Sequence, residues 1–584
     1  MKRKLITILL LLVTQVVLPQ TQDEWITYFE RSGFTETPNY HEAMEYYQKL
    51  ADFSPLAEFK SFGVSPQGRE LKFLIVSKEK VFKPTKAKEI HKPIILIING
   101  IHAGEIGGKD ASMLLLREIL ITKERRSLID SVTILIVPIF NVDGHERMGK
   151  YNRINQNGPE EMGWRTTAQN LNLNRDWMKA DSPEMRAMLK LFSDWLPDFT
   201  IDTHATDGAD YQYTITYSVE KFSNIYSGTA NWLKEKFIPA IEKGVQEKGF
   251  LVYPYIYLKK WREGLDGGII DWASTPRFST GYAALQNRPS LLIETHMIKP
   301  YKDRVYSTKA MLETTIEFVN TSAAELIELN LEADVFSAEN LSKQKKYLHV
   351  GFKESGRYEM IDFKGYEYYR DSSKISGSNK LVYTDVKKNF KIKHFNDIVP
   401  LDSVMLPKAY LIPKEWSKLV DILEIHGIQV NYLKVDSIFE VTKYRFKNVK
   451  FANSSYEGRQ RVDLEYDLIR EKRTVPSGTF YIPLNQRTIR IIANLLEPKS
   501  SDSFIRWGFM NAIFERKEYF EKYVMEKIAE QMLNKDVKLR KEFEEKLNED
   551  EEFRNNPEAR LNFFYKRSPY QDKNYQIYPV MRID

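Results

Sequence analysis

Apolar runs alternate with helical stretches between Lys92 and about Tyr301, which is the pattern of an α/β domain. β-Branched residues fill the short apolar runs and Gly or Pro flanks them, so strands are favoured over buried helices. The predicted strands are residues 93–99, 131–137, 198–202 and 290–293, and residues 112–120 are predicted to form a helix.

Beyond this region the pattern changes. A helical stretch at 309–331 is expected to close the first domain, and residues 340–490 mix short strands with turns. One unit there is clear: strand 409–412, helix 416–425, Gly427 as a left-handed cap, and strand 429–433. Residues 504–564 carry Glu, Lys and aromatics at helical spacing.

The chain of 584 residues is too long for one hydrophobic core, so we expect two or three domains. We predict a first, α/β domain at residues 21–335 and an α+β accessory domain at residues 336–490. Residues 491–584 are predicted to form a helical C-terminal region. We find no internal repeat.

The N-terminus has the pattern of a secretory signal. Lys2, Arg3 and Lys4 precede an apolar run from Leu5 to Leu18, which is too short for a comfortable membrane span. We therefore predict a signal peptide at residues 1–20 and an exported protein, periplasmic or secreted, with no stable membrane insertion after signal removal. A buried N-terminal helix is the alternative.

Composition narrows the possible chemistry. The formal net charge is +6 and no dense Lys/Arg cluster stands out, which argues against nucleic acid as a partner. The chain has no cysteine, so disulfides are impossible and any metal site must use His and carboxylate ligands. That limitation favours a catalytic over a structural zinc.

Polar residues follow three of the predicted strands. His102 and Glu105 come after the first strand, His204 after the third, and Glu294 ends the fourth. The carboxyl ends of strands in an open α/β sheet form the ligand-binding edge, so these side chains are expected to meet there. Two His and one Glu form a zinc ligand set that leaves a position open for water, and a nearby unligated Glu could take the water's proton.

These residues resemble the zinc carboxypeptidases, and the match extends beyond the ligands. Further motifs similar to the family's are Asn141-Val-Asp-Gly144, Leu173-Asn174-Arg175 and Gly267-Gly268-Ile-Ile-Asp271-Trp272. The resemblance spans about residues 92–300. It implies a mixed central sheet flanked by helices within residues 21–335, in a bacterial-type member with a long C-terminal extension.

The resemblance also implies residue roles. His102, Glu105 and His204 would hold one zinc per chain, and Glu294 would be the general base. Asn174 and Arg175 would bind the terminal carboxylate of a peptide substrate.

The chain departs from the family pattern at several positions that handle substrate. The family has two arginines three residues apart, and the second polarises the scissile carbonyl; this chain has Arg153 and Gln156 at those positions. Three alternatives stay open: Arg153 takes this role, Gln156 donates a weaker neutral hydrogen bond, or zinc supplies more of the polarisation. Glu263 stands where the family has its substrate-covering Tyr, for which Tyr282 or another loop aromatic could substitute. Asn172 replaces an Asp that would orient a zinc histidine.

The leading hypothesis is hydrolysis of peptide bonds at or near a free C-terminus, with nutritional or cell-wall peptides as substrates. The alternatives are a cell-wall peptide endopeptidase or an N-acyl amino acid amidohydrolase that uses the same zinc site, and a catalytically inactive binding protein. Asp202, Asp207, His145 and His296 are expected to support the site or to be solvated, not to bind metal.

Overall fold

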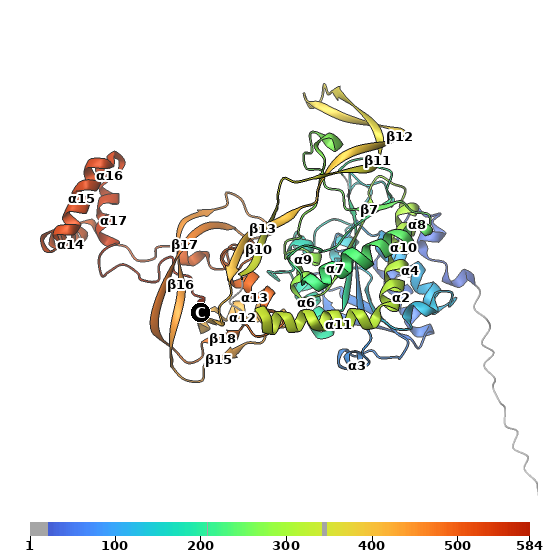
Figure 1. Cartoon of the computed structure of the whole chain (residues 1–584), viewed down its shortest axis with the longest axis horizontal. Coiled ribbons are helices and arrows are strands. Elements are labelled where there is room, and N and C mark those ends of the chain that lie inside the picture. Colours follow the sequence, from blue (N-terminus) through green and yellow to red (C-terminus); the bar gives the residue numbers. More distant parts are fainter. Residues whose placement is uncertain (1–21, 207, 342–346) are drawn as a thin grey trace, which may run out of the picture.

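A mixed eight-stranded sheet forms the centre of the first domain in the computed structural model, which describes residues 22–206, 208–341 and 347–584 (Figure 1). The strand order is β1-β2-β4-β3-β5-β9-β6-β7. Strands β4, β3, β5 and β9 run parallel to one another. β2 is antiparallel to both of its neighbours, β1 and β4, and β6 is antiparallel to β9. The strands are β1 (Ala57–Val64), β2 (Glu70–Ser77), β3 (Ile94–Asn99), β4 (Thr133–Val137), β5 (Phe199–Thr206), β6 (Ile215–Ser218), β7 (Val252–Pro254) and β9 (Ser290–His296).

Alternate residues of these strands face two separate cores, because successive side chains of a strand point to opposite faces. Ile95 and Ile97 of β3 pack with the helices α2 (Tyr40–Phe53), α4 (Gly107–Leu120), α8 (Ile238–Glu247) and α10 (Tyr301–Thr321). Leu96 and Ile98 pack with α6 (Pro183–Trp195), α9 (Ser279–Leu285) and the accessory helices α12 (Ser417–Ile425) and α13 (Ile489–Leu496). The prediction of a mixed sheet flanked by helices is confirmed.

The accessory part contains further sheets. β10 (Tyr347–Glu354) pairs with β13 (Ile398–Met405), and a long hairpin of β11 (Glu359–Ser372) and β12 (Asn379–Phe395) reaches β8 (Ile269–Ile270) of the first domain. A six-stranded sheet has the order β15-β18-β14-β19-β16-β17. Its strands are β14 (Ala409–Ile412), β15 (Asn431–Tyr432), β16 (Ser437–Phe451), β17 (Val462–Val475), β18 (Phe480–Pro483) and β19 (Met581–Ile583).

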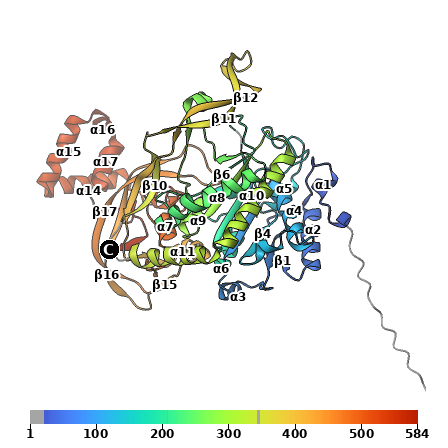
Figure 2. The same cartoon turned by 45° about the vertical axis from the view of Figure 1, so that its right-hand side comes forward.

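The C-terminal region is only partly helical. α14 (Lys522–Lys535), α15 (Val537–Glu549), α16 (Glu551–Asn555) and α17 (Pro557–Tyr565) share a small core and lie apart from the rest (Figures 1 and 2). The helical stretch expected from residue 504 begins at 522, and β19 returns the chain end to the accessory sheet. β19 has only three residues, too few to show the alternation of apolar and polar side chains by which a strand is predicted from sequence.

Other local features follow the sequence closely. Gly427 ends α12 with φ +77°, the predicted left-handed cap. The stretch 309–331 is divided between α10 and α11 (Ala323–Val335). The remaining helices are α1 (Tyr28–Arg31), α3 (Pro84–Glu89), α5 (Val142–Glu146) and α7 (Ser227–Trp232). Among the described residues, no helix combines the length and the apolar character that a membrane crossing requires. The predicted signal at residues 1–20 lies outside the described part.

Candidate active site

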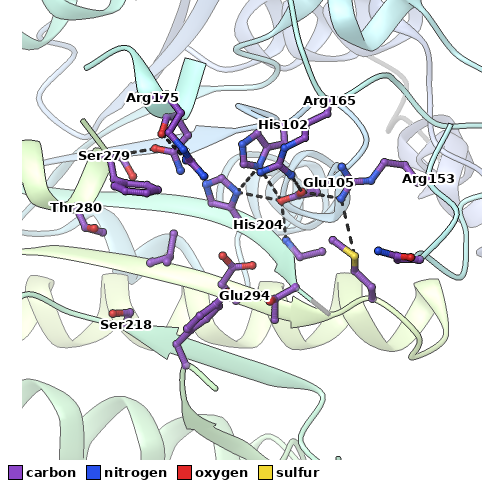
Figure 3. A pocket seen from close by; sticks show the side chains of 18 of the residues that line it. His102, Glu105, Arg153, Arg165, Arg175, His204, Ser218, Ser279, Thr280 and Glu294 are labelled. Atoms are coloured by element: carbon purple, nitrogen blue, oxygen red, sulfur yellow. Dashed lines mark hydrogen bonds and ion pairs between the residues drawn. The ribbon is translucent and has the colours of Figure 1, made fainter. Parts of the chain in front are cut away.

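Three side chains from two adjacent parallel strands and their loops meet at the carboxyl edge of the sheet. His102 and Glu105 follow β3, and His204 lies near the end of β5. The Nδ1 atoms of the two histidines are 3.2 Å apart, and they lie 3.2 Å (His102) and 3.0 Å (His204) from Oε2 of Glu105 (Figure 3). All three residues are buried.

The chemistry of this donor set fits zinc. Ligand atoms at about 2.0–2.1 Å from a tetrahedral zinc are separated from one another by roughly 3.4 Å, close to the observed spacing. The far nitrogen of each ring also has an oxygen partner: Nε2 of His102 lies 3.0 Å from Oδ1 of Asn172, and Nε2 of His204 lies 2.8 Å from Oδ2 of Asp202. A proton on each Nε2 leaves the Nδ1 lone pair free for a metal.

Glu294 lies beside this triad. It is the register partner of His204 across the β5–β9 pair, so its side chain and that of His204 share one face of the sheet. Its Oε2 is buried and has no hydrogen-bond partner among the described residues. Burial, reinforced by the carboxylates of Glu105 and Asp202, raises the pKa of Glu294 to about 8. A cation held by the triad would favour the ionised form.

These groups open into a cavity of about 500 Å³ that is large enough for a small ligand or a peptide end. Asn174 and Arg175, in the 3-10 turn Leu173–Arg175, lie in its wall. Nη1 of Arg175 donates to the carbonyl of Asn174 at 2.7 Å, and its guanidinium lies 4.2 Å above the ring of Phe278. Within the described residues no carboxylate forms an ion pair with Arg175. Burial lowers the pKa of the Arg175 guanidinium. This half-buried cation is available to an anionic group in the cavity.

Two further arginines line the same cavity. Arg153 and Arg165 form ion pairs with Oε1 of Glu105 at 2.7 and 3.0 Å (Figure 3). Burial opposes ionisation of Glu105, but His102 and Arg153 hold its pKa well below the usual range. Sequence reasoning selected Arg153 and missed Arg165, which lies in none of the quoted motifs. Gln156 does not line the cavity, because its amide donates to the carbonyls of Gly104 and Gly158. This geometry does not fit a carbonyl-polarising role for Gln156.

Of the aromatics that the sequence left open, Tyr282 does not line the cavity and other loop aromatics do. Tyr282 is fully buried and its hydroxyl lies 3.0 Å from Nδ1 of His426, so it cannot reach a substrate. Glu263 pairs with Lys260 and is also absent from the wall. Tyr255 and Trp272 line the cavity instead, with ring centroids 5.1 Å apart. Trp272 ends the Gly-Gly motif quoted from the sequence, and an aromatic cluster before that motif was the signal that could have indicated Tyr255.

The remaining candidate residues have supporting places. Asp202 orients His204 as described above. Nε2 of His145 lies 3.1 Å from Nζ of Lys109, and Nδ1 lies 2.8 Å from Oε1 of Glu146. The ring of His296 lies 4.2 Å from that of Tyr211 at an interplanar angle of 50°, and its Nε2 lies 2.9 Å from the carbonyl oxygen of Ala209. Asp207 lies outside the described residues.

Residues 43–304 match the zinc carboxypeptidase family model. The chain is 22% identical over 504 residues to carboxypeptidase 2 of Trichophyton equinum, covering 82% of this chain and 85% of that protein. It is 21% identical to a probable carboxypeptidase 2 of Arthroderma benhamiae, covering 81% and 86%. Among solved structures, a metallo-carboxypeptidase from Burkholderia cenocepacia matches at 19% identity over 49% of this chain and 70% of that one, with a TM-score of 0.36.

Proposed function

We propose, from the premise that residues 43–304 are a zinc carboxypeptidase domain, a specific division of labour for this metallopeptidase. His102, Glu105 and His204 hold one zinc, and Glu294 is the general base. Asn174 and Arg175 bind the C-terminal carboxylate of a peptide substrate, and Arg153 with Arg165 supplies positive charge.

One observation carries the proposal most strongly. Three groups line one cavity: the metal-ligand triad, Glu294 and Arg175. Among the described residues, Oε2 of Glu294 has no hydrogen-bond partner and Arg175 has no carboxylate partner. A peptide end offers a carboxylate for the arginine and a scissile carbonyl for the metal. The spatial separation of these features would place the last peptide bond of a substrate between them.

The chain's own residues account for proton movement and orientation. When bound, zinc supplies Lewis acidity and an acidified water. Glu294 accepts that water's proton and returns it to the nitrogen of the departing amino acid, which general acid–base catalysis requires. Arg175 makes charge-assisted bonds to the substrate carboxylate, which fixes the register of the peptide. Glu105 keeps Arg153 and Arg165 next to the reacting carbonyl, where positive charge offsets developing negative charge.

Export of the enzyme, by a signal at residues 1–20, is part of this proposal. An exported enzyme would meet nutritional peptides or cell-wall stem peptides. An endopeptidase or an amidohydrolase would use the same metal ligands but would not need Arg175 to recognise a free peptide C-terminus.

The test measures zinc content and then activity on one peptide with either a free or an amidated C-terminus. We expect one zinc per chain and much faster cleavage of the free form. Equal cleavage of both forms would refute terminus recognition and indicate an endopeptidase. Stoichiometric zinc without activity on peptides or N-acyl amino acids would favour a binding protein.

A further inference from the structure

A tight turn of the accessory domain reaches the active-site loop of the first domain. β16 and β17 form a hairpin whose tip is the turn Tyr456–Arg459, closed by hydrogen bonds of 2.9 and 3.1 Å between the backbones of these two residues. This hairpin tip, residues 456–459, lies against residues 171–181, more than 270 positions earlier in the chain.

The hairpin tip contacts both ends of the segment that carries the carboxylate-binding residues. Oε2 of Glu457 accepts a hydrogen bond of 2.8 Å from the backbone N–H of Asn172. The hydroxyl of Tyr456 lies close enough to the guanidinium of Arg175 to favour its charged form. We propose that Tyr456 and Glu457 are positioning residues that hold Arg175 and its turn in the orientation that binds a substrate's C-terminal carboxylate. This inference rests on the proposed carboxypeptidase function.

The hairpin tip is itself firmly held. Arg459 forms ion pairs of 2.5 and 2.7 Å with the carboxylate of Asp181 and lies 3.4 Å above the ring of Phe509. The ring of Tyr456 stacks on buried Trp507, with centroids 5.9 Å apart and planes 10° from parallel. Contacts on both domains therefore fix the position of the tip before any substrate arrives.

The backbone at the tip indicates that Glu457 is there for its side chain. Glu457 has φ +51° and Gly458 has φ +74°, the left-handed pair of a two-residue hairpin turn. Asn or Asp is the common first residue of such turns, because a short polar side chain can hydrogen-bond to the local backbone and so tolerates a positive φ, which is costly for other residues. The carboxylate of Glu457 instead reaches across the domain boundary to Asn172.

The type of partner at each end also suits substrate binding. A carboxylate on Arg175 would compete with the substrate carboxylate for the same donors. The phenol oxygen of Tyr456 can orient the guanidinium without neutralising it. The acidic Glu457 is bonded to a backbone N–H, and Oδ1 of Asn172 then accepts the N–H of Asn174 at 3.0 Å. The turn that presents Asn174 and Arg175 is thereby fixed at its start and its end.

The test uses full-length, zinc-loaded protein with the substitutions Tyr456→Phe and Glu457→Asn. Tyr456→Phe removes only the hydroxyl. Glu457→Asn provides a residue better suited to the turn, yet too short to reach Asn172. We expect KM for a peptide with a free C-terminus to rise roughly two- to tenfold in each variant, the effect of one hydrogen bond. We expect kcat to change less, and cleavage of the amidated peptide to stay as in wild type.

Controls separate positioning from folding. Tyr466→Phe removes a hydroxyl that has no hydrogen bond within the described part of the same hairpin, and it should leave KM unchanged. Thermal unfolding should show Glu457→Asn to be as stable as wild type or more so, and zinc content should stay at one per chain. A variant that loses activity equally on free and amidated peptides would count against positioning.

The possible outcomes distinguish this inference from the proposed function. If wild type prefers the free peptide and both variants keep that preference within twofold, the positioning role is overturned and the carboxypeptidase function stands. If wild type shows no preference, the proposed function fails and this inference fails with it. A loss of preference in both variants, with stability and zinc retained, supports the role of the hairpin tip.

Discussion

Replacing Arg175 by Met tests whether the terminal carboxylate of the substrate is recognised. Methionine keeps an unbranched apolar stem but lacks the guanidinium that lies over Phe278, so it removes the charge and every hydrogen-bond donor. Because no described carboxylate pairs with Arg175, the substitution leaves no buried anion behind, and the loss specific to the free peptide should reflect substrate binding. A charge-assisted hydrogen bond contributes about 2–3 kcal/mol, which corresponds to a roughly 30–150-fold lower kcat/KM.

The assay compares kcat/KM of wild type and variant on a peptide with a free C-terminus and on its amide. The loss should appear on the free peptide, and the two proteins should be similarly poor on the amide. Arg516→Met is the matched control, because the guanidinium of Arg516 also lies over an aromatic ring, that of Tyr565 at 4.3 Å, and neither residue lines the cavity. A less than threefold loss on the free peptide, or an equal loss on both peptides, would refute a role of Arg175 in carboxylate recognition.

The other predictions concern the base, the metal and the pH dependence of stability. Glu294→Gln should keep the zinc and the fold but lower kcat by roughly 10²–10⁴-fold, and a variant with a tenth of wild-type activity would contradict its role as base. His204→Ala should not retain tight zinc, so stoichiometric metal by elemental analysis would disprove the ligand assignment. Burial raises the pKa of Glu220 from 4.5 to about 7, so the folded state keeps this proton in a pH range where the unfolded chain loses it. Stability should therefore fall as pH rises from about 4.5 to 7, by on the order of 1–3 kcal/mol, and Glu220→Gln should flatten that decline in urea unfolding curves measured across this range.

Parallel strands of the first domain were predictable because both of their faces are buried. The sequence of such a strand is an unbroken run of apolar residues, and β3 and β4 are buried along their whole length. The polar residues that follow them are conspicuous by contrast. His102, Glu105, His204 and Glu294 could therefore be grouped from the sequence, since the direction of parallel strands already places their ends at one edge.

Residues that act across long sequence separations were not predictable in this way. Arg165 approaches Glu105 from a loop without regular periodicity, and the loop's path decides which side chains enter the cavity. Tyr282 was one of the aromatics that the sequence left open as a substrate contact, but α9 turns it into the core beside Trp177. The direction of a helical side chain depends on what the helix packs against, which one sequence does not state.

By itself, the sequence determined the chemical composition of the site and the strand ends that deliver it. It did so because hydrophobic periodicity is a local property, and side chains that follow parallel strands share one edge of the sheet. The tertiary structure made β3, β5 and β9 neighbours, which brings the four side chains together. Tertiary structure alone decided which neighbours complete the site: Arg165, Tyr255 and the hairpin tip with Tyr456 and Glu457. These contacts depend on how two domains pack through a shared core, and the free energy of that packing is spread over many residues.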